Sequence, residues 1–234
     1  MPAGQIVFLG DVHGPRDKWE LFRQVVARIS LENEEELETI VCQCGDFGYF
    51  PNVFDFWPPQ NVEIPDWMRV FFIRGNHDNS WALQEFQDCG KPVEFVSRIF
   101  FVPDGLVLEF FGQKILFIGG AETPKSCRAQ LGIDYWPGEV VNMRSIFRAL
   151  NNCQDAGPID FVLSHTCPSS FEIINDKGVE VSDNGCRRLL QEVFEVVSPD
   201  FWFFGHYHAN SEGKTGTTIW QDLGQTGEVR VFIF

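Results

Sequence analysis

The sequence predicts an α/β fold, in which strands and helices alternate along the chain. Two observations carry this prediction: apolar runs of strand length alternate with amphipathic segments of helical period, and five of those runs end in polar residues beside a glycine or serine. With 234 residues, of which 44% are hydrophobic, the chain is long enough to bury one sizeable core. We therefore expect a single domain over residues 1–234.

The first half of the chain shows the alternation most clearly. Residues 5–10 read as a strand, and residues 17–31 read as an amphipathic helix. Further strands are predicted at 39–45 and 69–75, and a further helix at 80–88. The side chains that we expect to face the sheet from the first helix are Trp19, Phe22, Val25, Val26 and Ile29.

The second half adds short strands to the same rhythm. Between residues 93 and 120, β segments with turns at PDG and FGQ predict hairpins added to the core. Strands are expected at 158–164 and 200–205, and helices at 139–152 and 184–197. The last two apolar segments, TTIWQDL and EVRVFIF, are joined by GQTG, so we expect them to form a closing hairpin.

The chain is strongly acidic. Its net charge of −15 at pH 7 repels polyanions and removes the attraction that normally dominates nucleic-acid affinity. Extended nucleic acid is therefore disfavoured as a substrate. Part of the charge lies in the run LENEEELE at 31–38, which we interpret as a solvated helix end or the turn after it.

Other features indicate a reducing, aqueous compartment. No apolar stretch approaches the ~20 residues of a membrane span, and the first residues run into a strand without a basic leader. We expect a cytoplasmic protein with no membrane partner, and the sequence identifies no protein partner. The seven cysteines lack framework spacing, which favours reduced thiols. Cys42 and Cys44 alternate along a predicted strand, so we expect both to pack on one side of the sheet rather than bind metal.

The polar residues at the strand ends carry the chemistry. Each of the five histidines follows an apolar run of strand length. In open α/β sheets, ligands bind at the carboxyl ends of the strands, so we expect the candidate residues to converge on one edge. They are Asp11, His13, Asp46, Asn76, His77, His165, His206 and His208.

This donor set predicts a metal centre. Imidazole, carboxylate and amide groups together suit Mn²⁺, Fe²⁺ or Zn²⁺, whereas Ca²⁺ and Mg²⁺ prefer oxygen ligands. Eight candidates exceed the needs of one ion. Two ions ~3.5–4 Å apart that share a carboxylate would use most of them and would form the clamp used for displacement at phosphorus. Glycine precedes Asp11, Asp46, Asn76 and His206, where it permits tight turns and close backbone approach.

The ordered series GDVHG, GDFG, GNHD, a lone His165 and GHYH, over residues 10–208, resembles the calcineurin-like metallophosphoesterase family. The resemblance implies a β-sandwich of mixed sheets flanked by helices, with the site at the carboxyl ends of the strands. It implies hydrolysis of a phosphate ester, as a phosphodiesterase or a phosphatase, with two divalent metal ions. Mn²⁺ is the first expectation, and Fe²⁺ and Zn²⁺ are the alternatives.

The resemblance also implies a role for each candidate residue. One metal would be held by Asp11, His13, Asp46 and His208. The second metal would be held by Asp46, Asn76, His165 and His206, so that Asp46 bridges the two ions. His77 would act as general acid at the leaving-group oxygen, and a metal-activated hydroxide would be the nucleophile. No covalent enzyme intermediate is then expected.

The chain departs from some branches of that family. Protein serine/threonine phosphatases and diadenosine tetraphosphatases continue GD into GDxxDRG, whereas this chain reads GDFGYF. The difference speaks against a protein-phosphatase assignment and leaves the residue that supports His77 unidentified. Candidate phosphate contacts are Arg16, Arg74 and Arg128, for which a surface or structural role is the alternative.

A looser resemblance covers residues 118–139. This segment is similar to a GGA…R…WWP-x-E segment of bacterial and phage-type members of the same family. The matching residues are Gly119, Gly120, Ala121, Arg128, Trp136, Pro137 and Glu139, with Tyr135 in the place of the first Trp.

The loop at 49–67 is rich in aromatic residues and proline. It could form a stiff apolar rim that grips a nucleobase, another aromatic part of a substrate, or a partner protein. The simpler interpretation, which we favour, is a loop packed on its own side chains. Two alternatives to a phosphodiesterase or phosphatase stay open: a metal-dependent nuclease, and a non-catalytic scaffold on the same fold.

Overall fold

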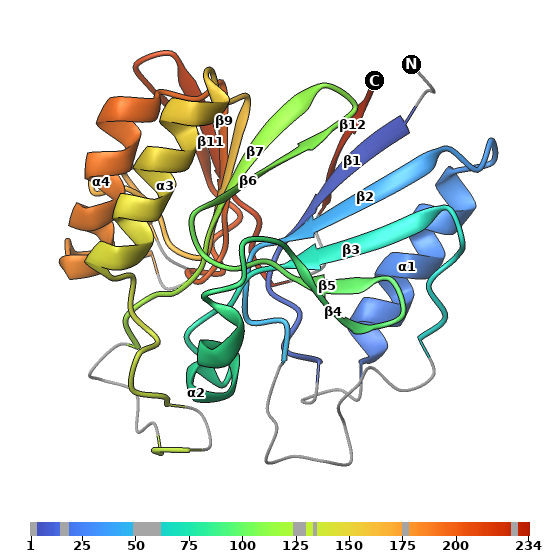
Figure 1. Cartoon of the computed structure of the whole chain (residues 1–234), viewed down its shortest axis with the longest axis horizontal. Helices are drawn as coiled ribbons and strands as arrows, with labels where there is room; N and C mark the ends of the chain where they lie inside the picture. Colours follow the sequence, from blue (N-terminus) through green and yellow to red (C-terminus); the bar gives the residue numbers. More distant parts are fainter. Residues whose placement is uncertain are drawn as a thin grey trace.

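The computed structural model describes residues 4–14, 19–48, 62–123, 130–132, 135–174, 178–225 and 229–234. Two mixed six-stranded sheets pack face to face, and helices cover their outer faces (Figure 1). This arrangement confirms the predicted α/β sandwich of mixed sheets. No helix within these ranges is both long and apolar enough to cross a membrane.

The first sheet contains the N-terminal strands. Its order is β12(Val229–Ile233), β1(Gly4–Leu9), β2(Glu38–Gln43), β3(Met68–Phe72), β5(Ile99–Phe101) and β4(Val93–Val96). The four central strands run parallel, and the two edge strands are antiparallel to their neighbours. The helix α1(Glu20–Glu32) covers the outer face with Phe22, Val25, Val26 and Ile29, as predicted. Trp19 is also buried there, but it lies at the N-cap with a φ of 67° rather than inside the helix.

The second sheet contains most of the C-terminal strands. Its order is β10(Glu212–Thr215), β11(Thr218–Asp222), β9(Phe201–Phe204), β8(Phe161–Ser164), β7(Gln113–Ile118) and β6(Leu106–Phe110). Its outer face is covered by α3(Met143–Ala156) and α4(Gly185–Val197) (Figure 1). Each of these helices buries one apolar side against the sheet. The short helix α2(Ser80–Leu83) and the 3₁₀ turn η2(Gln84–Phe86) follow β3 and account for the helix predicted at 80–88.

An apolar layer between the sheets joins them. Phe8 of the first sheet stacks on Phe203 of the second, with ring centroids 4.4 Å apart. Cys42 and Cys44 are both buried in this layer, which confirms that they share one side of the sheet. Since burial of apolar surface drives folding, this layer fixes the two sheets against each other and aligns the ends of their strands.

The closing hairpin predicted at the C-terminus is wrong. β11 pairs with β9 and β10 in the second sheet, whereas β12 crosses to the first sheet and pairs antiparallel with β1. The alternation of apolar side chains correctly indicated two strands. Which strand each of them pairs with depends on which strand at a sheet edge still lacks a neighbour. β1 is such a strand, and β12 pairs with it.

Two further boundaries differ from the sequence interpretation. The segments at 93–120 do form two hairpins, β4–β5 and β6–β7, of which the second turns at FGQ as predicted, whereas PDG joins β5 in the first sheet to β6 in the second. β5 and β7 also pair in parallel with β3 and β8, so both hairpins are integral to the sheets. The helix expected at 139–152 begins at Met143, because the side chain of Asn142 caps it by accepting a hydrogen bond from the Ser145 backbone N–H. The acidic run at 31–38 covers the last residues of α1 and the turn after it, up to the start of β2, and is mostly exposed.

Candidate metal centre

The carboxyl ends of five strands bring the predicted site residues together. β1, β2 and β3 of the first sheet supply Asp11, His13, Asp46, Asn76 and His77, and β8 and β9 of the second supply His165, His206 and His208. Contacts between these two sets join the sheets at the site. They include His208 with Asp11 and His165 with Asp46.

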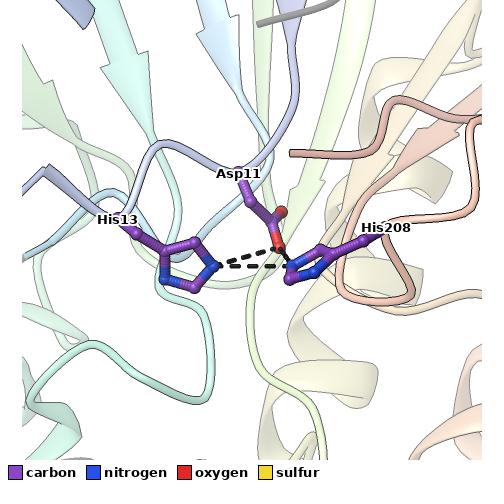
Figure 2. A group of neighbouring side chains, drawn as sticks. All are labelled: Asp11, His13 and His208. Carbon is purple, nitrogen blue, oxygen red and sulfur yellow. Dashed lines mark hydrogen bonds and ion pairs between the residues drawn. The ribbon is translucent and has the colours of Figure 1, made fainter. Parts of the chain in front are cut away.

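One group of donors comes from Asp11, His13 and His208 (Figure 2). His208 Nε2 lies 3.0 Å from Asp11 Oδ2 and 3.5 Å from His13 Nε2. His13 Nε2 lies 3.7 Å from Asp46 Oδ2. These separations fit the edges between donor atoms around one ion with bonds of about 2.0–2.2 Å.

A second group surrounds Asn76. Its carbonyl oxygen Oδ1 lies 2.9 Å from His165 Nε2 and 2.9 Å from His206 Nδ1. His165 Nε2 also lies 3.5 Å from Asp46 Oδ1. Asp46 therefore presents one carboxylate oxygen to each group, Oδ2 to the first and Oδ1 to the second.

The donor atoms of the second group fit a cation. His165 Nδ1 is 2.8 Å from the backbone oxygen of Cys44, which can only accept, so Nδ1 carries the proton of a neutral ring. The lone pair of Nε2 then faces Asn76 Oδ1, which is also an acceptor. Burial opposes protonation of His165, but the nearby carboxylates of Asp46 and Asp11 raise its pKa to about 9. The surroundings of Nε2 therefore favour a positive charge. A divalent ion would supply that charge.

Asp46, Asp11 and His206 have the charge states that metal ligands need. Burial alone would raise the pKa of Asp46, but His165 and His77 hold it well below its ordinary value. Burial opposes ionisation of Asp11 as well, and the hydrogen bond with His208 leaves its pKa lowered. Burial, with His165 nearby, lowers the pKa of His206 to about 3, which keeps that ring neutral. Two carboxylates and a neutral imidazole suit an ion that accepts mixed nitrogen and oxygen ligands.

The backbone at the site adopts conformations that ordinary residues avoid. His13, Asp46, His208 and His206 have φ values of 48°, 52°, 54° and 70°. For residues other than glycine, such left-handed conformations are uncommon, and they concentrate at functional sites. The surrounding structure therefore holds these four side chains in fixed directions.

Two glycines bear out the predicted close approach. A Cβ atom at Gly75 would lie 2.0 Å from Asp46 Oδ1, and one at Gly205 would lie 2.1 Å from Asp11 Oδ1. Only glycine leaves room for these carboxylates.

Comparison with known proteins agrees with this geometry. The family model for calcineurin-like phosphoesterases matches residues 4–210. The chain belongs to the calcineurin-like phosphoesterase family. Two curated relatives are lariat debranching enzymes: one of Drosophila pseudoobscura pseudoobscura, 24% identical over 245 residues, and one of Entamoeba histolytica, 21% identical over 251 residues. The matches cover 87% and 95% of this chain but 42% and 69% of those proteins, so the chain spans less than half of the fly relative.

A solved structure shares the fold of this phosphoesterase-family chain. GAP50, the anchor in the inner membrane complex of Plasmodium, matches with a TM-score of 0.57 at 12% identity. The match covers 96% of this chain and 72% of GAP50. At this identity the likeness is one of fold.

His77 lies beside the two donor groups of the phosphoesterase site rather than within them. Its backbone N–H donates to Asp46 Oδ1 at 2.8 Å, and its ring centroid is 5.5 Å from that of His13. Its Nδ1 is buried and has no hydrogen-bond partner among the described residues. The ring is therefore next to the first donor group, and its backbone is tied to the carboxylate that both groups share.

Sequence reasoning missed two buried carboxylates that support the site. Asp78 accepts hydrogen bonds from the backbone N–H groups of Gly75, Phe47 and Gly48, and so ties the turn of Asp46 to that of Asn76. Asp78 is the last residue of the GNHD motif, and this position next to two candidate site residues could have indicated a role at the site.

The second carboxylate, Asp222, supports the turn that carries His208. It accepts from the N–H groups of Ala209 and Gly224, and the Gly224 carbonyl accepts from Asp11 N–H. Burial raises the pKa of Asp222 to about 7. Its place at the end of a predicted strand was a signal of the same kind as the one that identified Asp11.

Arg74 does not face a substrate. It is buried, and all five of its guanidinium N–H groups donate within the protein, to Asp104 and to the backbone oxygens of Gly138, Glu139 and Val140. No donor is left for a phosphate, so the structural alternative replaces the predicted phosphate contact.

Several predictions fall outside the described residues. Arg16 and Arg128 lie there, as do residues 49–61 of the aromatic loop. The described end of that loop packs Val62, Ile64 and Trp67 partly against the apolar cluster beneath α1.

Proposed function

We propose that this chain hydrolyses a phosphate ester with two divalent metal ions, Mn²⁺ first and Fe²⁺ or Zn²⁺ as alternatives. The observation that carries the proposal is Asp46, which directs one oxygen to each donor group. Asp11, His13, Asp46 and His208 would hold one ion, and Asp46, Asn76, His165 and His206 the other. The bound ions would supply Lewis acidity and the positive charge that stabilises a transferring phosphoryl group.

The residues of the chain have distinct tasks in this proposal. The two groups orient a phosphate ester above the strand ends by fixing where its oxygens bind. His77 donates a proton to the leaving-group oxygen. Its position supports this role, because its backbone is fixed by Asp46 and its ring lies next to that of His13.

The favoured substrate is a small or peptide-borne phosphate ester. A net charge of −15 discourages a long polyanion, whereas two divalent ions beside Asp11 and Asp46 would attract a phosphate at short range.

We place the protein in the cytoplasm because its cysteines lack the spacing of a disulfide framework and its apolar stretches are shorter than a membrane span. The complete donor set speaks against the scaffold alternative, because burying so many polar side chains costs folding free energy.

A nuclease is the second candidate. The two curated relatives are named lariat debranching enzymes, and that name favours including a branched nucleic acid among the substrates tested. Cleavage of branched RNA, with linear single- and double-stranded DNA and RNA as controls, would identify this activity.

Hydrolysis of p-nitrophenyl phosphate and bis-p-nitrophenyl phosphate, each with added Mn²⁺, tests the proposal directly. Asp46→Asn serves as the control for contaminating activity. We expect metal-dependent hydrolysis by the wild type alone. A preference for the diester would indicate phosphodiesterase chemistry, and a preference for the monoester would indicate phosphatase chemistry. If protein shown by metal analysis to hold two ions cleaves neither ester nor nucleic acid, the proposed activity is wrong.

A further inference from the structure

The segment at 118–139 makes contacts that the proposed function does not yet explain. Thr123 donates twice to the carboxylate of Glu139, from its backbone N–H at 2.7 Å and from its hydroxyl at 2.9 Å. The same hydroxyl oxygen accepts from the amide nitrogen of Asn76 at 3.0 Å. All three side chains are buried, so a buried chain of hydrogen bonds runs from Glu139 to the second donor group.

This chain of hydrogen bonds determines which way the Asn76 amide faces. A threonine hydroxyl has one proton to donate, and Thr123 donates it in the hydrogen bond to Glu139, whose ionised carboxylate can only accept. The Thr123 oxygen can then only accept from Asn76, so the amide NH₂ must lie on the Thr123 side. The Asn76 carbonyl oxygen is thereby turned toward His165 and His206. If the amide were reversed, two N–H donors would occupy the place of a metal ligand.

Glu139 is itself fixed by the buried residue Arg74. The Arg74 guanidinium is paired with Asp104 at 2.8 Å and donates to the backbone oxygens of residues 138–140. The Ala121 N–H donates to the Glu139 carbonyl, so residues 121 and 139 are also joined directly. At Gly120, whose φ is 97°, a Cβ would lie 2.8 Å from the Arg74 nitrogens. Gly120, Ala121 and Glu139, which belong to the segment similar to GGA…R…WWP-x-E, therefore form a rigid support with Arg74.

We infer that Thr123 and Glu139 are positioning residues, which hold the Asn76 amide with its oxygen toward the second metal position. The inference rests on the proposed function, because it assigns these residues a task toward one of the two ions. They touch neither the substrate nor the ions, and they act through Asn76. Residues that orient metal ligands in this way typically contribute about 10–100-fold to metal affinity.

Per-site binding of Mn²⁺ by isothermal titration calorimetry, with metal content by mass spectrometry, tests the inference in the whole chain. Thr123→Val keeps the shape of the side chain but removes the hydroxyl. We expect the affinity of one site to fall about 10–100-fold while the other site is unchanged. Thr123→Ser keeps the hydroxyl and should restore wild-type affinity for both ions.

Glu139→Gln gives a sharper test. The glutamine oxygen would accept from the Thr123 N–H, so its NH₂ would face the hydroxyl oxygen of Thr123. The hydroxyl proton would then point at Asn76 and favour the reversed amide. We therefore expect Glu139→Gln to weaken the same single site by a similar factor, although it is nearly isosteric.

A matched control separates positioning from general stability. Thr218 is another buried threonine, and its hydroxyl donates to the Pro199 backbone oxygen at the start of β11, on the edge of the sheet opposite to the site. Thr218→Val should lower the unfolding temperature of the metal-free protein and leave both Mn²⁺ affinities unchanged.

The outcomes distinguish failure of this inference from failure of the proposed function. If wild type binds two ions and both Thr123→Val and Glu139→Gln bind them with wild-type affinities, the positioning role is overturned. If Thr123→Val does not fold, by circular dichroism, Glu139→Gln and Thr123→Ser decide the question. If wild type binds fewer than two ions, the proposed function itself has failed.

Discussion

The two donor groups of the site are built differently. His165 in the second group is fully buried, its Nδ1 is fixed by the Cys44 carbonyl, and its neighbour Asn76 is fixed by Thr123. In the first group the side chain of His208 is 30% exposed, and its Nε2 contacts Asp11 and His13, which are donors of the same group. Contacts from outside the group therefore hold the second group, whereas the two contacts of His208 in the first group are with donors that would share its ion.

Asp46→Asn should have the largest effect, because Asp46 belongs to both groups. The neutral amide removes one negative charge from each ion position and turns an N–H donor toward one of them. We expect turnover to be abolished and both Mn²⁺ affinities to weaken. Loss of only one ion, by calorimetry and metal analysis, would show that Asp46 does not bridge the groups.

His77→Ala should separate chemistry from metal binding, because His77 lies beside both groups and in neither. We expect turnover to fall about 100- to 10,000-fold, as for loss of a general acid, with two ions still bound. A substrate with a good leaving group should lose less activity than one with a poor leaving group. If metal analysis finds an empty site in this variant, His77 is a ligand and its proposed role is wrong.

Removal of metal should destabilise the protein, because Asp11 and Asp46 then repel each other in a buried site. An ion present at 100 times its dissociation constant stabilises the folded state by about 2.7 kcal/mol. For a chain of this size, that corresponds to a rise in Tm of about 5–10 °C on adding Mn²⁺ to chelator-treated protein. Differential scanning fluorimetry measures the rise, and Asp46→Asn should reduce it.

The smallest expected effects are on the stability of the metal-free protein, when one histidine from each group is replaced. His165→Ala leaves a buried cavity and deprives the Cys44 carbonyl of its donor, so we expect a loss of about 2 kcal/mol in the free energy of unfolding. His208→Ala, at a partly exposed position, should cost less than about 1 kcal/mol. Urea denaturation measures both losses, and equal losses would contradict the difference in support between the two groups.

The sequence was most informative at the ends of the strands. Glycine followed by a polar residue after an apolar run marks such an end, and the topology of an α/β sheet then places these ends together. For that reason Asp11, Asp46 and Asn76 could be assigned to one site although they are far apart in the chain. Periodicity reports the spacing of side chains but not backbone conformation, so it placed Trp19 inside a helix that in fact begins after it.

Other features depend on contacts that have no local signature. The pairing of β12 with β1 follows from an open sheet edge, which adjacency in the sequence does not encode. Asp78 and Asp222 stand at strand ends like the candidate ligands, and only the structure shows that they accept hydrogen bonds from backbone N–H groups instead. Arg74 precedes a ligand motif, but only its burial against Asp104 distinguishes a structural arginine from one that binds phosphate.

The contact between Asp11 and His208 joins residues that are 197 positions apart in the chain. A ribosome adds about 5–20 residues per second, so Asp11 is made tens of seconds before the histidine that completes its group. During that interval the edge of β1 also lacks β12, which is translated later still. The proposed metal site therefore cannot be complete until synthesis has passed His208, and an ion bound there would report that this point has been reached.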